Sequence, residues 1–303
     1  MNKYIKIMRL DHWIKQLFIL PGFICMIFLN KFNISFEIIL KILIALFSTS
    51  LIASANYTIN EYLDAKYDKY HPTKKNRPLV NKNINGNIIF IIWLLLGITG
   101  LTLSYFFINN YFFICELWLL IMGLLYNVEP FRTKDIFILD VLSESLNNAI
   151  RFLLGWFIIK SNTIIPISIV LGYWLGGAFL MATKRYAELK MIANKEIASL
   201  YRKSFKYYSE ETLLTSAFFY AICSVFFIGI FLIKYRIELI LAIPFIVGLF
   251  CFYLHLAFKK DSAVQKPEKL YHEKGLLLYC LFLIILFSIL MYINIPWLNI
   301  FYN

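Results

Sequence analysis

The sequence predicts an all-α protein that crosses a membrane several times. Of its 303 residues, 60% are apolar and 18% are aromatic, and the mean hydropathy is +0.70. A soluble domain of this length does not need so much apolar surface, because a single core stops growing well before that. Long apolar runs recur along the chain, each long enough for a spanning helix. We therefore expect a polytopic helical bundle, forming a single membrane domain over residues 1–303.

The apolar runs predict about nine membrane-spanning helices. Their ranges are 16–34, 36–62, 87–108, 110–127, 138–160, 164–186, 212–233, 236–258 and 275–299. Residues 1–15, before the first span, are basic and amphipathic and are expected to lie at the membrane interface. The second span turns polar without any Pro or Gly, which predicts one helix that continues past the hydrocarbon. The sixth span also turns polar at its end.

The positions of the basic residues predict the orientation. Most of the 30 Lys and Arg residues lie in the N-terminal segment and in the loops on the same side of the membrane. Because cytoplasmic loops carry such an excess of positive charge, we expect the N-terminus and these loops in the cytoplasm, with the protein in the cell membrane. The net charge of +12 then reflects topology and attraction to anionic lipid. No nucleic-acid-binding motif is present.

A polar segment at residues 60–79 carries the first candidate site. Asn60, Asp64 and Asp68 are spaced four residues apart, so on a helix they share one face. Glu61 lies beside them, about 100° around the helix axis. Carboxylate and amide oxygens on one face suit Mg²⁺ that is held jointly by protein and phosphate. The alternative is a solvated helix end whose acids pair with lysines nearby on the same helix.

Basic residues follow these acids directly. Lys74 and Arg77 belong to the sequence HPTKKNRP, in which two prolines mark a loop. A diphosphate–Mg²⁺ complex needs acids that hold the ion next to bases that hold the phosphate oxygens. The two halves together favour phosphate chemistry over a solvated loop. We expect polar cytoplasmic active-site loops at residues 65–86 and 184–211.

Other polar residues lie farther along the chain. The end of the sixth span carries Lys184, Arg185 and Glu188, and Lys134 and Asp140 stand near the start of the fifth.

Inside the fifth span, Glu144 and Arg151 are costly in a bilayer and should face a shared polar cavity. An equally weighted alternative is that these two residues pair with each other or with a neighbouring helix. In the fourth span, Glu116 is either a cavity acid or a residue near the interface.

These motifs resemble those of the UbiA superfamily of intramembrane prenyltransferases. NEYLDAKYD at residues 60–68 resembles the first aspartate-rich motif, NDxxDxxxD, with Glu61 in place of its first Asp. HPTKKNRP at 71–78 resembles the HPxKxxRP signature of one branch, the polyprenyl-phosphate phosphoribosyltransferases of the decaprenylphosphoryl-5-phosphoribose synthase type. KRYAEL at 184–189 is similar to that branch's KRxAEL, and RLDHWIKQ at 9–16 is similar to its RPxQWxKN opening.

The resemblance implies a nine-helix bundle around a central cavity that opens to the cytoplasm. It implies a transferase that moves 5-phosphoribose from phosphoribosyl diphosphate to a polyprenyl phosphate, with Mg²⁺ as cofactor, in cell-wall or glycolipid precursor biosynthesis. The Mg²⁺-diphosphate would be held by Asn60, Asp64 and Asp68, with Glu61 as an outer ligand. Phosphate groups would be held by Lys74, Arg77, Lys184 and Arg185. Ribose hydroxyls, or a supporting role, would fall to Tyr186, Glu188 and Asp140. The lipid phosphate would meet Lys15, Lys134 and Arg151.

The chain departs from the family pattern at a second motif. Aromatic-prenylating members carry YAxxDxxxD, whereas this chain has Lys190 and Asn194 in the two acid positions. A site with fewer acids and more bases argues against two-metal ionisation of a prenyl diphosphate and agrees with an additional anionic substrate. The alternatives are a UbiA-type prenyltransferase with an aromatic or lipid acceptor and, from another class, a transporter or lipid-binding protein. Charges at the ends of spans, away from the midplane, favour an enzyme.

Overall fold

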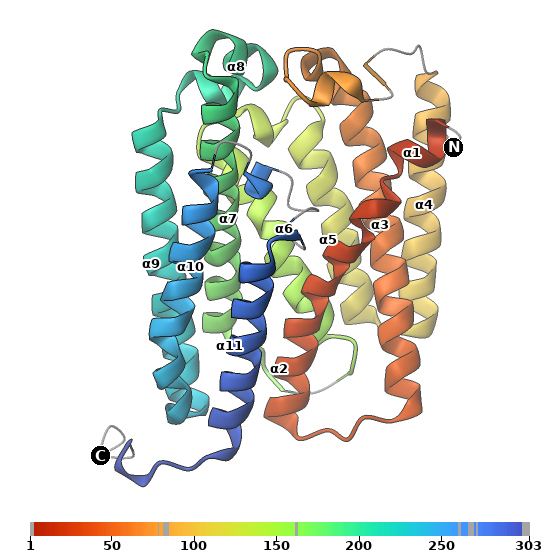
Figure 1. Ribbon diagram of the computed structural model, residues 1–303. Helices are drawn as coiled ribbons and strands as arrows, with labels where there is room; N and C mark the ends of the chain where they lie inside the picture. Colours follow the sequence, from red (N-terminus) through yellow and green to blue (C-terminus); the bar gives the residue numbers. More distant parts are fainter. Residues whose placement is uncertain are drawn as a thin grey trace. The chain divides into compact units, whose positions relative to one another are not determined.

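The computed structural model describes residues 3–77, 79–80, 85–160, 163–259, 262–265, 270 and 272–298, and no strand occurs among them (Figure 1). Pro78 and residues 81–84 of the predicted loop 65–86 lie outside the described residues, as does residue 299 of the last predicted span. The chain divides into two compact units. The expectation of a single membrane domain stays a prediction.

Unit 1 comprises Met1–Ile165 and Ile192–Tyr208. Its helices are α1 (Lys3–Ile7), the 3₁₀ helix η1 (Leu10–Ile19), α2 (Leu20–Asn30), α3 (Phe36–Asp68), η2 (Lys74–Asn76), α4 (Gly86–Phe107), α5 (Asn110–Asn127), η3 (Thr133–Asp135), α6 (Leu139–Trp156), α8 (Lys195–Tyr201) and η4 (Lys203–Lys206). Unit 2 comprises Pro166–Met191 and Ser209–Asn303. Its helices are α7 (Ile167–Ile192, with the last residue counted in unit 1), α9 (Glu210–Tyr235), η5 (Ile237–Ala242), α10 (Ile243–Ala257), η6 (Ala263–Gln265) and α11 (Lys274–Tyr292).

Eight helical segments of the described residues are long and apolar enough to cross a membrane. They are Tyr4–Asn30, Phe36–Asp68, Gly86–Phe107, Asn110–Asn127, Ile167–Ile192, Glu210–Tyr235, Ile237–Ala257 and Lys274–Tyr292. These segments correspond to eight of the predicted spans, so the all-α membrane fold is confirmed. The other predicted span, 138–160, contains helix α6, whose 18 residues include the charged Asp140, Glu144 and Arg151 and so hold no long uncharged stretch. The count of nine stays a prediction.

Helix α3 runs unbroken from Phe36 to Asp68, as the absence of Pro and Gly predicted. It begins at Ser35, whose Oγ accepts a hydrogen bond from the backbone N–H of Ile38 at 3.4 Å. The helix packs along α4 in unit 1 (Figure 1). A length of 33 residues carries the acids of its last turns beyond the apolar part of the helix.

Two predicted spans begin as 3₁₀ helices. Residues 16–19 belong to η1 before α2 begins, and residues 237–242 belong to η5 before α10 begins. Pro21 and Pro244 lie in the first turns of α2 and α10. Proline has no N–H to donate and fits the first turn of an α-helix, so it marks the point where each α-helix starts.

The interior of unit 1 contains an apolar core. Its core combines Phe23 of α2, Ile52 of α3, Phe112 of α5 and Leu154 of α6, with further aliphatic side chains around them. Helices α2 and α6 approach closely: an added Cβ at Gly22 of α2 would lie 1.9 Å from the carbonyl oxygen of Phe152 of α6. This packing fixes the frame that holds the polar residues described next.

Candidate active site

The loop after α3 folds back onto the acids of that helix. Arg77 Nη1 donates to Asp68 Oδ2 at 2.6 Å, and Asp68 is 1% exposed. Burial disfavours the charge of Arg77, but the carboxylates of Asp68 and Glu61 outweigh this and hold the pKa of Arg77 above its usual value. The other oxygen, Asp68 Oδ1, is buried without a hydrogen-bond partner among the described residues. Buried polar atoms normally have a hydrogen-bond partner, so a buried carboxylate oxygen without one is consistent with a site that binds an ion or a ligand.

Asp64 receives two cations from the segment around η3. Arg132 Nη2 lies 3.0 Å from Asp64 Oδ1, and Lys134 Nζ bonds the same oxygen. Burial lowers the pKa of Lys134 to about 8, although the neighbouring Asp64 carboxylate opposes this effect. The sequence indicated Lys134 as a site residue. Arg132 was not among the predicted site residues, although it stands two residues before Lys134 in the same polar segment.

Asn127, the last residue of α5, joins Asn60 to this group. Asn127 Oδ1 accepts hydrogen bonds from Asn60 Nδ2 at 2.5 Å and from Lys134 Nζ at 2.8 Å. The backbone carbonyl of Asn127 accepts another from Arg132 Nη1 at 2.9 Å. Asn127 therefore sets the spacing between the acid-bearing face of α3 and the cations of η3.

Glu61 faces a different partner in the N-terminal segment. Arg9 Nε lies 3.5 Å from Glu61 Oε2, and the guanidinium carbon of Arg9 lies 5.6 Å from the ring centre of Tyr57. Glu61 is 3% exposed. The pair ties the start of the chain to α3, and it was not predicted because nothing in the local sequence joins residues 9 and 61.

Asp140 lies buried in the first turn of α6. Its two carboxylate oxygens accept hydrogen bonds from Tyr208 at 2.7 Å and from Ser204 at 3.1 Å, and Arg202 Nη1 lies 3.7 Å away. These contacts come from the segment that follows α8. Asp140 therefore holds residues of that segment, and whether it also meets the ribose hydroxyls stays a prediction.

The polar residues of α6 contact neighbouring segments. Tyr126 of α5 donates to Glu144 Oε2 at 2.7 Å, and Arg151 Nε donates to Gln16 Oε1 at 3.0 Å. The sequence left two alternatives for Glu144 and Arg151, a shared polar cavity or pairing. The structure shows that each has a partner on a neighbouring element. Gln16 Nε2 and Asn147 Oδ1 are buried and have no hydrogen-bond partner within the described part of the chain. The shared polar cavity around α6 stays a prediction.

Lys15 lies close to this part of unit 1. Its Nζ is 3.0 Å from His12 Nδ1 in the 3₁₀ helix η1, the element that also carries Gln16. Ten of the predicted site residues lie in unit 1: Asn60, Glu61, Asp64, Asp68, Lys74, Arg77, Lys134, Asp140, Arg151 and Lys15.

The other four predicted residues belong to α7 in unit 2. Arg185 Nη1 donates to Glu188 Oε2 at 3.1 Å, and both side chains are almost fully buried. The ring of Tyr186 packs against that of Phe258, with 5.5 Å between the ring centres. Lys184 is half-buried on the same helix. A common site with the acids of α3 stays a prediction for these four residues.

The acid face of α3 fits a hard divalent cation by the chemistry of its donors. Asn60, Asp64 and Asp68 offer amide and carboxylate oxygens, the atoms that Mg²⁺ binds, and Asp68 Oδ1 lacks another partner in the described residues. Across that part of the chain, no three His, Cys, Asp or Glu side chains form a metal-binding group by themselves. An ion here would therefore draw ligands from Asn60 and from bound phosphate as well.

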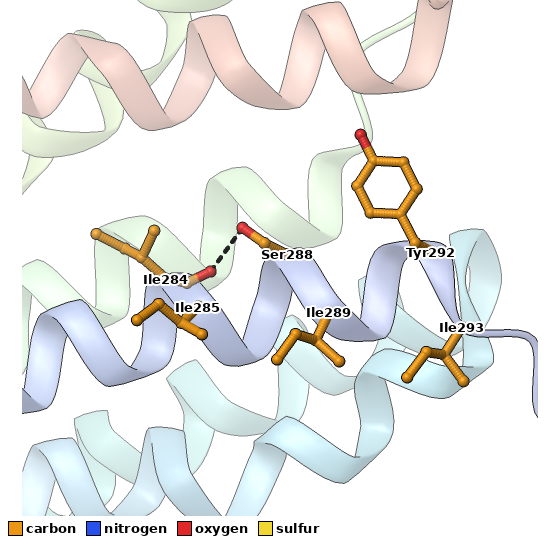
Figure 2. Close-up of a pocket in the computed structure, with 6 residues that line it drawn as sticks. All are labelled: Ile284, Ile285, Ser288, Ile289, Tyr292 and Ile293. Atoms are coloured by element: carbon orange, nitrogen blue, oxygen red, sulfur yellow. Dashed lines mark hydrogen bonds between the residues drawn. The ribbon is translucent and has the colours of Figure 1, made fainter.

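An open apolar pocket of about 470 Å³ lies elsewhere, along α11 in unit 2 (Figure 2). Its lining residues are Ile284, Ile285, Ser288, Ile289, Tyr292 and Ile293. Ser288 Oγ bonds the carbonyl oxygen of Ile284 at 2.8 Å, and Tyr292 carries the second hydroxyl of the lining (Figure 2). This pocket offers no cation for a phosphate, and its apolar surface is that of a helix in lipid.

A sequence profile of the UbiA prenyltransferase family matches residues 18–284. The chain belongs to the UbiA prenyltransferase family. It is therefore a multi-pass membrane transferase.

Three similar curated proteins, two from strains of Mycobacterium tuberculosis and one from Mycolicibacterium smegmatis, are named decaprenyl-phosphate phosphoribosyltransferase. Each of those from Mycobacterium tuberculosis is 28% identical over 211 residues, which cover 69% of this chain and 67% of that protein. The one from Mycolicibacterium smegmatis is 27% identical over 215 residues, which cover 69% of this chain and 63% of that protein. The resemblance that the motifs indicated is confirmed.

Solved structures of UbiA relatives share the fold. A UbiA homologue from Archaeoglobus fulgidus bound to DMAPP and Mg²⁺ has a TM-score of 0.70, is 20% identical and covers 96% of this chain and 100% of its own. The same homologue bound to GPP and Mg²⁺ has a TM-score of 0.68, is 20% identical and covers 93% of this chain and 99% of its own. A digeranylgeranylglyceryl phosphate synthase has a TM-score of 0.63, is 22% identical and covers 91% of this chain and 96% of its own. At these identities the likeness concerns the fold alone.

Proposed function

We propose that the chain transfers 5-phosphoribose from phosphoribosyl diphosphate to a polyprenyl phosphate and releases diphosphate. The observation that carries the proposal is the contact between Arg77 and Asp68, which puts the basic part of the HPTKKNRP segment directly on the acid face of α3. The names of the mycobacterial relatives support the same reaction.

The reaction forms one bond and breaks one. An oxygen of the lipid phosphate bonds to C1 of the ribose, and the bond from C1 to the diphosphate oxygen breaks, with its electron pair leaving on the diphosphate. The attacking phosphate is already ionised at neutral pH, so no strong general base is required. The rate then depends on positioning and on stabilising the charge of the leaving group.

The residues of unit 1 fit these tasks. Asn60, Asp64 and Asp68 would hold Mg²⁺, with Glu61 as an outer ligand. When bound, the ion supplies charge neutralisation for the diphosphate. Arg77 and Lys74 would hold phosphate oxygens, and Asp140 would keep the segment after α8 in place.

Further roles follow from the proposal. The lipid phosphate would meet Lys134, Arg151 and Lys15. In α7, Lys184 and Arg185 would add phosphate contacts, and Tyr186 and Glu188 would face the ribose or support it. We place the protein in the cell membrane, with its N-terminus and active-site loops in the cytoplasm, where a water-soluble donor is available.

The test uses the full chain in lipid nanodiscs with labelled phosphoribosyl diphosphate, polyprenyl phosphate and Mg²⁺. We expect label in the lipid fraction, and loss of transfer with EDTA, with Asp64→Asn and with Asp68→Asn. Glu37→Gln is the control, because its carboxylate is 74% exposed and lies at the other end of α3. Full activity of both aspartate variants would show that the metal assignment is wrong.

A second candidate function is prenyl transfer from a prenyl diphosphate to an aromatic or lipid acceptor. It is favoured by the homologue structures that were solved with DMAPP or GPP. Supplying geranyl diphosphate and a mixture of aromatic acceptors separates the two reactions. Product formed only with the prenyl donor would replace the phosphoribosyl proposal.

A further inference from the structure

Tyr201, the last residue of α8, lies at the centre of a second basic cluster in unit 1. Lys74 Nζ donates to its hydroxyl and lies 4.7 Å from the ring centre. The guanidinium carbon of Arg202 lies 6.0 Å from the same ring centre. The ring attracts both cations, but two like charges on one ring also repel each other. An anion bound between them would offset that repulsion.

The Lys74 side of this cluster is held rigidly. The buried imidazole of His71 accepts hydrogen bonds at Nδ1 from the backbone N–H groups of Thr73 and Lys74, each at 3.2 Å. The same imidazole packs edge-on against Tyr201, with 4.6 Å between the ring centres. These contacts fix the loop backbone from which the Lys74 side chain reaches Tyr201.

The Arg202 side is held by a different set of partners. Arg202 Nη1 donates to the hydroxyl of Tyr126 at 3.1 Å and lies 3.7 Å from Asp140 Oδ2. Asp140 is itself fixed by Ser204 and Tyr208. Both cations therefore belong to a preorganised arrangement, which lowers the cost of binding a charged group.

The cluster lies next to the acid face of α3. Lys74 interacts electrostatically with Asp68, and Arg202 interacts electrostatically with Asp64. Lys74 and Arg202 also lie outside the eight membrane-spanning segments. A ligand of this cluster would thus meet it from the aqueous side while another part of the same ligand occupied the acid face.

We propose that Lys74, Tyr201 and Arg202 form a second anion subsite, which takes the phosphate monoester at C5 of the donor ribose. The inference rests on the proposed function, in which the acid face takes the diphosphate at C1 of the same ribose. Two cations and a phenol hydroxyl suit a phosphate dianion, because charge-assisted hydrogen bonds are the stronger ones. A prenyl diphosphate carries its charge at one end only and would leave this subsite unfilled.

A polyprenyl phosphate also ends in a phosphate monoester. The proposed function already gives the lipid phosphate other partners, Lys134, Arg151 and Lys15, so the subsite is assigned to the soluble donor. With this assignment, Tyr201 and Arg202 join the residues that bind phosphate. Lys74 then binds the phosphate at C5 of the ribose, whereas the acid face binds the diphosphate at C1.

The experiment compares Lys74→Ala and Tyr201→Phe with wild type in nanodiscs. We expect the KM for phosphoribosyl diphosphate to rise about tenfold or more in Lys74→Ala, and by a smaller factor in Tyr201→Phe, with an unchanged KM for polyprenyl phosphate. Ribose 5-phosphate should raise the unfolding temperature of wild type and not that of the variants. Inorganic diphosphate with Mg²⁺ should stabilise all three. Lys75→Ala, an exposed lysine one residue along, is the matched control.

The outcomes separate the two proposals. If wild type transfers phosphoribose but both variants keep its donor KM and its stabilisation by ribose 5-phosphate, the subsite is wrong and the function stands. A rise in the KM for the lipid alone would assign the cluster to the acceptor phosphate and overturn the inference. If wild type neither transfers phosphoribose nor is stabilised by ribose 5-phosphate, the proposed function itself fails.

Discussion

Asn60 donates its side-chain hydrogen bond to Asn127, so the first residue of the acid motif is joined to the last residue of α5. The same oxygen of Asn127 also accepts from Lys134. A neutral amide thereby holds an amide of α3 and a buried cation of η3 at a fixed separation. The acid face is organised by this contact as well as by its ion pairs.

Replacing Asn127 should disturb the site more than the fold. Asn127→Ala removes the acceptor shared by Asn60 and Lys134, and we expect a loss of about 1–3 kcal/mol in the free energy of unfolding. Transfer should fall by a larger factor, because both neighbours lose their positions. Thermal unfolding and initial rates in nanodiscs measure the two effects. Asn87→Ala, on an exposed position of α4, serves as the control, and a wild-type rate for Asn127→Ala would contradict the role.

Arg77 is expected to stabilise the loop after α3 through Asp68. Arg77→Ala leaves a buried carboxylate without its cation, which should cost about 3 kcal/mol of stability. The double variant Asp68→Asn/Arg77→Gln should recover part of that loss, because no unpaired charge remains. Lys69→Ala is the control, since Lys69 is exposed nearby. Equal unfolding temperatures for Arg77→Ala and Lys69→Ala would rule out the stabilising contact.

Two glycines should be essential to unit 1 for a reason unrelated to catalysis. An added Cβ would lie 1.9 Å from the Ile19 carbonyl oxygen at Gly155 and 1.9 Å from the Phe152 carbonyl oxygen at Gly22. Backbone atoms cannot move away as a side chain can, so each alanine variant should lose about 3 kcal/mol or more.

Gly97 provides the comparison for these variants. Its added Cβ would meet the flexible side chain of Leu120 at 3.4 Å, so Gly97→Ala should be tolerated. Size-exclusion chromatography of detergent extracts reports the folded fraction. Normal yields of Gly22→Ala would contradict the close approach of α2 and α6.

Glu116 is expected to act in packing rather than in catalysis. It is fully buried in α5, and its Oε1 accepts hydrogen bonds from Ser48 at 2.7 Å and from Thr49 at 2.9 Å, both on α3. The carbonyl of Gln can accept the same bonds, so Glu116→Gln should retain stability and transfer. Glu116→Leu should lose about 1–3 kcal/mol, because the two hydroxyls lose their acceptor. A loss of transfer in Glu116→Gln at normal stability would instead point to a chemical role.

Hydropathy was sufficient to predict most of the fold. The span 36–62 and its polar continuation form a single helix, α3, because a run without Pro or Gly has no reason to stop at the membrane boundary. The 3₁₀ segments η1 and η5 were not predicted, since apolar content does not distinguish a 3₁₀ helix from an α-helix.

The candidate site was predictable only in part. The period of a helix places Asn60, Asp64 and Asp68 on one face, and this needs no tertiary information. Their partners Asn127 and Arg132 come from the end of another helix and the loop behind it. Which distant segment meets an acid depends on the packing of the whole unit, and no local pattern in the sequence encodes it.

The length of α3 has a consequence for how a lipid substrate would be handled. At 1.5 Å per residue its 33 residues extend about 50 Å, whereas the hydrocarbon of a bilayer is about 30 Å thick. Residues 60–68 occupy the final 13 Å or so, and from this excess of length we expect them at the height of the lipid headgroups. Under the proposed function, the phosphate of a polyprenyl phosphate already resides at that height. The long isoprenoid tail can therefore remain dissolved among the acyl chains throughout turnover, and the enzyme has no need to extract its acceptor from the bilayer.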